Sequence, residues 1–277
     1  MSRLASQFAL LKKQRRKALI PYIMAGDPAP WVTVPLMHAL VRAGASAIEL
    51  GVPFSDPMAD GPVIQRAAER ALKHGITLRA VLDTVREFRT KDALTPVVLM
   101  GYLNPIERMG YQAFAAAAGD AGVDGVITVD LPPEEADDLL AALKTHDLDP
   151  IFLLAPTSDR ERIQVVVRAA GGFIYYVSLR GVTGASHLDL DEVKGKLQSI
   201  RRHTDLPLGV GFGINSPEIA ADVASFADAV VVGSAVVGRI EQEAAHPERL
   251  LVEVPAFVSR LRQAMDAAAG ATAARTA

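Results

Sequence analysis

The chain has 277 residues, half of them hydrophobic, and its 29 basic and 32 acidic side chains give a net charge of −3. This balance gives no basic footprint for nucleic acid, and no apolar run approaches the roughly 18 residues expected of a membrane span. The sequence contains no cysteine, which excludes disulfides, zinc thiolate sites and cysteine nucleophiles and fits a cytoplasmic location.

The first predicted element is a helix over residues 1–16, because Leu4, Phe8 and Leu11 recur at helical spacing. Short apolar runs follow, each bounded by Gly, Pro or Asp, and their length and composition predict strands buried on both faces. These eight runs are Leu19–Met24, Ala47–Leu50, Val97–Gly101, Gly125–Val129, Ile151–Leu154, Phe173–Val177, Leu208–Gly211 and Ala229–Val232.

Amphipathic segments between the strands predict helices. They include Trp31–Ala43, Leu78–Arg89, Glu134–Leu143, Asp159–Ala170 and a segment that begins after Ser216. Ser158 is the predicted cap of the fourth of these helices. Residues from about 268 to 277 offer little apolar surface and should fray.

Alternating strands and helices are typical of a parallel sheet covered by helices. Eight such units in about 250 residues predict an α/β fold, a single (β/α)₈ TIM barrel over residues 1–277 with an extra N-terminal helix. The alternative, an open doubly wound sheet, normally carries a G-x-G-x-x-G turn after its first strand. That turn reads Ala25-Gly26-Asp27-Pro28 here, which favours the barrel.

Glu49 is the first candidate for chemistry, because it lies inside an apolar strand and the active sites of barrels form at the carboxyl ends of strands. A buried carboxylate is rare unless it is paired or functional. The alternative is a structural Glu satisfied by backbone N–H groups. Asp60 ends the proline-rich loop that follows and brings a second carboxylate to the same rim, although position alone favours a helix N-cap there.

Glycine turns follow the last three predicted strands, at Gly181–Gly184, Gly209–Gly213 and Gly233-Ser234. In barrels, backbone N–H groups of these loops and the helix after the last strand hold phosphate. Tyrosine and phenylalanine near the strand ends, including Tyr22, Tyr175 and Phe212, favour a flat apolar substrate.

Elimination narrows the chemistry further. No lysine falls at the end of a predicted strand, which argues against a Schiff-base enzyme. Every histidine except His187 lies on a predicted helix or its end, which argues against a metal site or a serine hydrolase triad. Carboxylate acid–base chemistry on a phosphorylated, partly apolar substrate remains.

The stretch ELGVPFSDPMADGP, residues 49–62, closely resembles the signature of the tryptophan synthase alpha chain family. The resemblance extends in order from about residue 8 to 265. It includes PYIMAGDP (21–28), GYLNP (101–105), GVTG (181–184), GVGFGI (209–214) and VVGSAVV (231–237). It implies cleavage of indole-3-glycerol phosphate to indole and glyceraldehyde 3-phosphate, without a cofactor in this chain.

By the same resemblance, Glu49 is the general acid–base and Asp60 accepts the indole N–H. The resemblance also implies three groups of binding residues. The substrate pocket comprises Tyr175, Tyr22, Met100, Val129, Leu153, Thr183 and Phe212; the phosphate cradle Gly184, Gly213, Gly233 and Ser234; and the partner interface Asp56, Pro57, Asn104 and Pro132. Plain loop chemistry is the alternative reading of the interface positions.

The expected partner is a beta chain that carries pyridoxal phosphate and joins the released indole to serine, in an alpha2-beta2 heterotetramer. One departure from the family pattern lies in the expected lid, where residues 178–181 read Ser-Leu-Arg-Gly instead of Ser-Arg-Ala-Gly, so that Arg180 is displaced by one position. The alternatives are a free-standing lyase, a catalytically silent activator of a beta chain, and another phosphate-binding barrel such as a relative of ribulose-phosphate isomerase.

Overall fold

The computed structural model describes residues 2–178, 189–211 and 213–275. Its strands all pair in parallel, in the order β5-β4-β3-β2-β1-β9-β8-β7-β6. Their bounds are β1 Ala18–Met24, β2 Ile48–Gly51, β3 Val97–Gly101, β4 Gly125–Thr128, β5 Asp149–Pro150, β6 Leu153–Leu154, β7 Ile174–Val177, β8 Leu208–Gly211 and β9 Ala229–Val232.

The outermost strands β5 and β6 belong to one segment, residues 149–154, which closes the barrel. On one side the Ile151 N–H donates to the carbonyl oxygen of Val126 (2.9 Å), and on the other the Phe152 carbonyl accepts from the Tyr175 N–H (3.0 Å). The strand predicted at Ile151–Leu154 is therefore real, but it begins earlier and is interrupted. The predicted barrel is confirmed.

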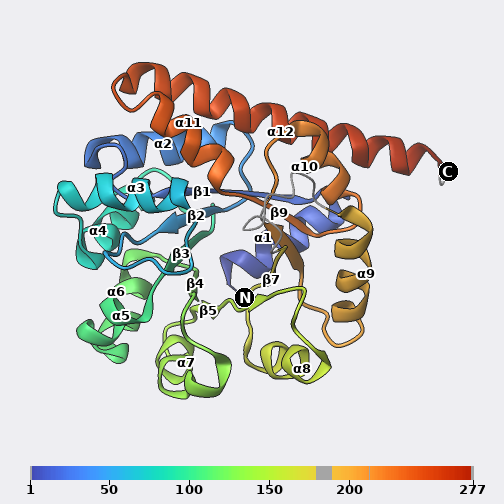
Figure 1. The fold of residues 1–277 in the computed structure, drawn as a ribbon, viewed down its shortest axis with the longest axis horizontal. Coiled ribbons are helices and arrows are strands. Elements are labelled where there is room, and N and C mark those ends of the chain that lie inside the picture. The colour runs from blue at the N-terminus through green and yellow to red at the C-terminus, as the bar shows by residue number, and fades with distance from the viewer. Residues whose placement is uncertain (1, 179–188, 212, 276–277) are drawn as a thin grey trace.

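Helices surround the strands, as Figure 1 shows. They are α1 Arg3–Lys13, α2 Pro30–Arg42, α3 Pro62–Lys73, α4 Leu78–Arg89, α5 Leu103–Met109, α6 Tyr111–Ala121, the 3₁₀-helix η1 Pro133–Glu135, α7 Asp137–Lys144, α8 Arg160–Ala169, α9 Leu190–Arg201, α10 Pro217–Ala224, α11 Ser234–Gln242 and α12 Pro247–Arg275. Within the described residues, none of these helices has the length and apolar character needed to cross a bilayer.

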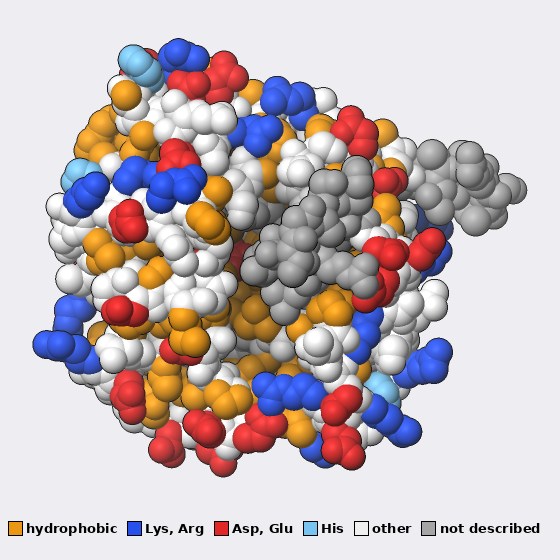
Figure 2. Space-filling view, in the orientation of Figure 1, with side chains coloured by type: hydrophobic (Ala, Val, Ile, Leu, Met, Phe, Trp, Pro, Cys, Tyr) orange, Lys and Arg blue, Asp and Glu red, His pale blue; other side chains and the backbone are white. Residues whose placement is uncertain are grey.

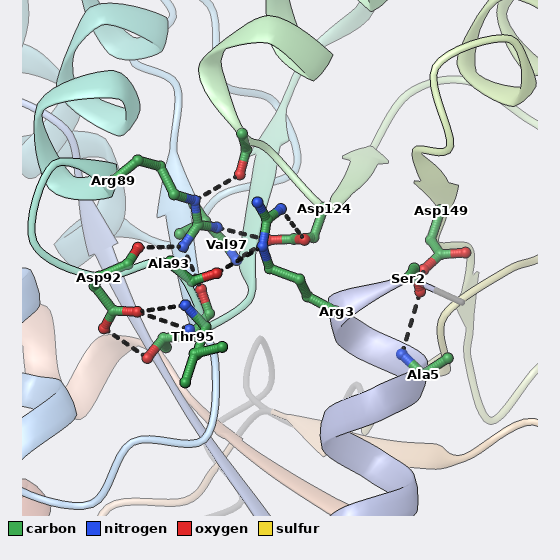
Figure 3. A network of polar contacts seen from close by, with 12 residues as sticks. Ser2, Arg3, Ala5, Arg89, Asp92, Ala93, Thr95, Val97, Asp124 and Asp149 are labelled. Carbon is green, nitrogen blue, oxygen red and sulfur yellow. Dashed lines mark hydrogen bonds and ion pairs between the residues drawn. The ribbon is translucent and has the colours of Figure 1, made fainter.

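The predicted extra helix is α1, and it packs against the amino ends of the barrel strands. Leu4 and Leu11 are buried with Ile127 and Phe173 in the core inside the barrel. Figure 3 shows how polar contacts fix this helix: the Arg3 guanidinium reaches the buried Asp124 carboxylate (2.9 Å), which also pairs with Arg89 (2.7 Å). The helix thus closes the end of the barrel opposite the carboxyl ends of the strands.

Two expectations about helix ends are corrected. Asp159, not Ser158, caps α8, because its carboxylate accepts from the Arg162 N–H (2.8 Å), whereas the Ser158 hydroxyl accepts from the Ala155 N–H (3.0 Å). At the other end of the chain, α12 continues to Arg275 instead of losing its helical geometry near residue 268. Its residues beyond Met265 are rich in alanine, which has the strongest intrinsic preference for helix.

Candidate active site

A cavity of about 650 Å³ lies at the carboxyl ends of the barrel strands. Figure 2 shows a hollow with hydrophobic side chains near the centre of this face. Its lining includes most of the predicted site residues: Tyr22, Glu49, Asp60, Met100, Val129, Leu153, Tyr175, Gly213, Gly233 and Ser234. The predicted Thr183, Gly184 and Phe212, together with Arg180, lie outside the described residues.

Glu49 lies in β2, beside Tyr22 of β1 in the strand register, and its side chain points into the barrel cavity. It is only 1% exposed, and neither carboxylate oxygen has a hydrogen-bond partner among the described residues. Burial, with a smaller contribution from the Asp60 charge, raises the pKa of Glu49 to about 8. No backbone N–H satisfies this carboxyl, which contradicts the structural alternative and leaves a group that holds a proton at neutral pH.

Asp60 lies at the end of the loop between β2 and α3, with one carboxylate oxygen held by Tyr102. The Tyr102 hydroxyl donates to Asp60 Oδ2 (3.1 Å) and accepts from the Ala59 N–H (3.0 Å). The N-cap of α3 is Gly61, without any side-chain cap bond, so the capping alternative for Asp60 is wrong. Burial raises the pKa of Asp60, and the hydrogen bond from Tyr102 opposes that rise.

Two tyrosines, Tyr22 of β1 and Tyr175 of β7, lie within the barrel over glycines of the neighbouring strands. A Cβ atom on Gly51 would lie 2.1 Å from the Tyr22 hydroxyl oxygen, and one on Gly211 would lie 2.3 Å from that of Tyr175. Burial raises the pKa of both phenols well above the ordinary value, and the Glu49 charge adds to this rise. Both tyrosines therefore stay neutral and line the site with flat rings.

The wall of the cavity is mostly apolar. Met100, Val129 and Leu153 contribute to it as predicted. The sequence reasoning missed further lining side chains, namely Ile64, Val177, Ile214 and Val231. The signal for Val177 was available, because residues two apart on a strand share a face and Tyr175 was already a candidate.

The glycine turns after β8 and β9 meet at one side of the cavity. Gly213 adopts a positive φ of 75°. Gly233 is the N-cap of α11, and Ser234 is its first residue. The first N–H groups of a helix have no partner within the helix and attract anions. This corner can therefore hold a phosphate through backbone donors.

Arg162 is the basic side chain among the described lining residues, and the sequence reasoning missed it. It extends from the first turn of α8 and its Nη1 binds both carboxylate oxygens of Glu134 of η1 (2.7 and 2.6 Å). The sequence gave no signal for this residue, since an arginine in an exposed helix turn is ordinarily a surface side chain.

The predicted partner positions lie on the loops that follow β2, β3 and β4. Asp56 and Asn104 are exposed, and Pro57 and Pro132 are half-buried. Met58, beside Pro57, is 86% exposed, which is unusual for a large apolar side chain. These neighbouring loops therefore present exposed polar and apolar groups around one side of the cavity mouth.

Comparison with known proteins identifies the family. A family model described as tryptophan synthase alpha chain matches residues 8–266. The tryptophan synthase alpha chain of Thioalkalivibrio sulfidiphilus is 62% identical over 96% of this chain and 100% of that protein. That of Nitrosococcus oceani is 60% identical over 96% of this chain and 98% of that protein.

Solved structures agree. The crystal structure of tryptophan synthase subunit alpha from Legionella pneumophila str. Paris superposes with a TM-score of 0.91 and 50% identity, covering 96% of this chain and 99% of that chain. A tryptophan synthase structure from M. tuberculosis gives a TM-score of 0.85 and 38% identity over 96% of this chain and 99% of that chain. With the buried Glu49, the neighbouring Asp60 and the phosphate corner in one cavity, these matches mean that this chain belongs to the tryptophan synthase alpha chain family.

Proposed function

We propose that Glu49 and Asp60 carry out the lyase half-reaction of this family, the cleavage of indole-3-glycerol phosphate to indole and glyceraldehyde 3-phosphate. The observation that carries the proposal is the contrast between the two carboxyl groups. Glu49 is buried without a partner and has a pKa of about 8, whereas Asp60 is held by Tyr102 at the same cavity. Two environments of this kind separate the roles of an acid and an ionised carboxylate.

The chemistry follows from these protonation states. Glu49 delivers its proton to C3 of the indole ring, and the bond between C3 and the side chain then breaks as the adjoining hydroxyl loses its proton to the Glu49 carboxylate. The hydroxyl carbon leaves as the aldehyde, and the proton balance returns Glu49 to its starting form. Asp60 accepts the ring N–H and offsets the positive charge that develops on the nitrogen.

The remaining lining of the cavity supports binding of this substrate. Tyr22, Tyr175 and the apolar wall fit a flat indole ring, and the closed barrel core behind them excludes water. Gly213, Gly233 and Ser234 fit the phosphate, because the first turn of α11 offers unpaired backbone donors. We assign the undescribed Thr183 and Phe212 to the pocket, and Gly184 to the cradle, on the family resemblance alone.

Family membership implies a beta-chain partner. We further infer that this chain works in the cytoplasm as one domain of an alpha2-beta2 heterotetramer, that it needs no cofactor of its own, and that the partner's pyridoxal phosphate consumes the indole. Asp56, Pro57, Asn104 and Pro132 are the proposed contacts, supported by their position at the cavity mouth, where indole would leave. A neutral apolar product favours direct transfer, since free indole would cross membranes.

Cleavage of indole-3-glycerol phosphate by the purified chain, measured with and without a beta chain, tests this proposal. We expect slow cleavage by the chain alone and a marked gain when the beta chain is added. Equal rates in both conditions would favour a free-standing lyase. No cleavage in either condition would overturn the enzymatic proposal and leave an activator of the beta chain.

A further inference from the structure

Arg70 is the centre of an ion network that joins three elements at the carboxyl end of the barrel. From α3, its Nε and Nη2 donate to both carboxylate oxygens of Asp27 in the loop after β1 (2.6 and 2.9 Å). Its Nη1 donates to Glu241 on α11 (2.7 Å). Arg66, one turn earlier on α3, also binds Glu241 through two bonds of 2.7 Å. All three guanidinium nitrogens of Arg70 are thus engaged on two carboxylates.

Burial and charge distinguish the two arginines. The Asp27 side chain is fully buried and that of Arg70 is 20% exposed, whereas that of Arg66 is 48% exposed. The hydrogen bonds from Arg66 and Arg70 hold the pKa of Glu241 at about 2, so this carboxylate is ionised at any working pH. A buried bidentate pair is directional and only weakly screened, whereas an exposed pair contributes little.

The two helices that this network joins carry opposite ends of the substrate site. The helix α3 begins two residues after Asp60, and α11 begins at Ser234 in the phosphate corner. Figure 1 shows α3 and α11 side by side, and α3 packs its Ala67 and Ala71 into the same apolar cluster as Val237 of α11. Hydrophobic contact between such small side chains has no preferred direction and permits sliding.

We propose that Arg70 is a positioning residue that fixes the separation between Asp60 and the phosphate cradle at Gly233 and Ser234. The inference rests on the proposed function of this cavity. The substrate engages Asp60 through its ring N–H and the cradle through its phosphate, so it gains from both contacts only when their spacing matches its length. A misplacement of roughly 1 Å can cost up to about a hundredfold in rate. Lysine cannot replace Arg70, because a single ammonium lacks the planar fork that binds both carboxylates.

Ligand binding to Arg70→Lys separates positioning from a general structural role. The probes are an uncleavable indole with a three-carbon phosphate side chain, indole alone, and inorganic phosphate alone, each titrated calorimetrically. We expect the dissociation constant of the linked ligand to rise about tenfold or more, because the two ends no longer bind as one, while each fragment stays within about twofold of wild type. An unchanged affinity for the linked ligand, or an equal loss for all three probes, would overturn the inference.

Glu241→Gln provides a second variant, because it cuts only the arm to α11 and keeps Arg70 paired with the buried Asp27. We expect the same selective loss for the linked ligand. Arg66→Gln is the matched control: it removes the exposed arginine on the same helix and should leave all three affinities within about twofold of wild type. A loss in Arg66→Gln as large as in Glu241→Gln would contradict the assignment to Arg70. Wild-type protein that fails to bind the linked ligand would instead overturn the proposed function.

Discussion

At the scale of single residues, the site depends on keeping a carboxyl group where its charge is unfavourable. Glu49 stands out in the sequence because an acid between Ile48 and Leu50 is costly to bury. The sequence reasoning could not decide between a structural and a catalytic role, since that depends on which donors surround the side chain. Tyr102 was noted only as a polar rim residue, and nothing in its sequence neighbourhood reveals that it binds Asp60, which is distant in the chain.

Glu49→Gln should change the pH dependence of stability. In the folded chain the pKa of Glu49 is about 8, above its ordinary value of 4.5, so the native state keeps a proton that the unfolded state loses. This contribution is complete below the unfolded pKa and is lost as pH rises toward 8. The free energy of unfolding of wild type, relative to the variant, should therefore fall by a few kcal/mol, about 1.4 per pH unit, between roughly pH 5 and 8. Denaturant titrations at several pH values measure it, and a difference independent of pH would contradict it.

Tyr102→Phe should weaken catalysis without emptying the core, since the phenyl ring can still stack on Phe54. The variant loses the hydrogen bond that opposes the rise in the pKa of Asp60, so this pKa should move further up. We expect turnover to fall about tenfold and the acidic limb of the pH–rate profile to shift to higher pH. Tyr111→Phe on α6 is a control with a similar change far from the cavity lining. A profile identical to wild type would show that Tyr102 does not tune Asp60.

At the scale of elements, the barrel strands were predictable because strands buried on both faces must be apolar. The predicted bounds of β3, β8 and β9 match the structure to the residue. The pattern failed at Asp149-Pro150, since Asp-Pro is ordinarily a turn signal, although it forms β5 here. It also gave no prediction for α6, whose alanine-rich sequence offers little contrast between its buried and exposed faces.

Gly51→Ala should test how closely β1 and β2 pack inside the barrel. The added Cβ would lie 2.1 Å from the Tyr22 hydroxyl oxygen, so the ring must move into the cavity or the strands must separate. We expect a loss of stability of about 1–3 kcal/mol together with weaker substrate binding. Gly195→Ala on α9, where a Cβ meets nothing within 4 Å, should instead be neutral or stabilising. In a Tyr22→Ala background the cost of Gly51→Ala should shrink; an unchanged cost would mean that the contact is not its source.

At the scale of the whole molecule, the barrel separates stability from chemistry. The carboxyl ends of the strands carry the cavity, while α1 and its contacts to Asp124 and Asp149 close the amino ends. The sequence predicted both the extra helix and the barrel, because helical spacing and strand count are local signals. It could not predict the Arg70 network, because Asp27, Arg70 and Glu241 are far apart in the chain and each is ordinary in its own segment.

Leu4→Ala should therefore destabilise the protein while sparing its activity. Leu4 is 1% exposed and packs against the barrel core far from the cavity lining. We expect a loss of about 2–5 kcal/mol in the free energy of unfolding, with kcat unchanged at temperatures where the variant remains folded. Leu10→Ala, on the exposed side of the same helix at 48% exposure, should cost little. A fall in kcat that precedes any unfolding of Leu4→Ala would contradict this division of roles.

The most direct test of the account as a whole is the turnover of indole-3-glycerol phosphate by Glu49→Gln, measured beside its affinity for the same substrate. Glutamine keeps the size of the side chain but cannot give up and take back a proton. The account predicts that cleavage falls by about a hundredfold or more while the dissociation constant stays within a few-fold of wild type. A variant that keeps more than about a tenth of wild-type turnover would contradict the assignment of Glu49 as the group that moves the proton.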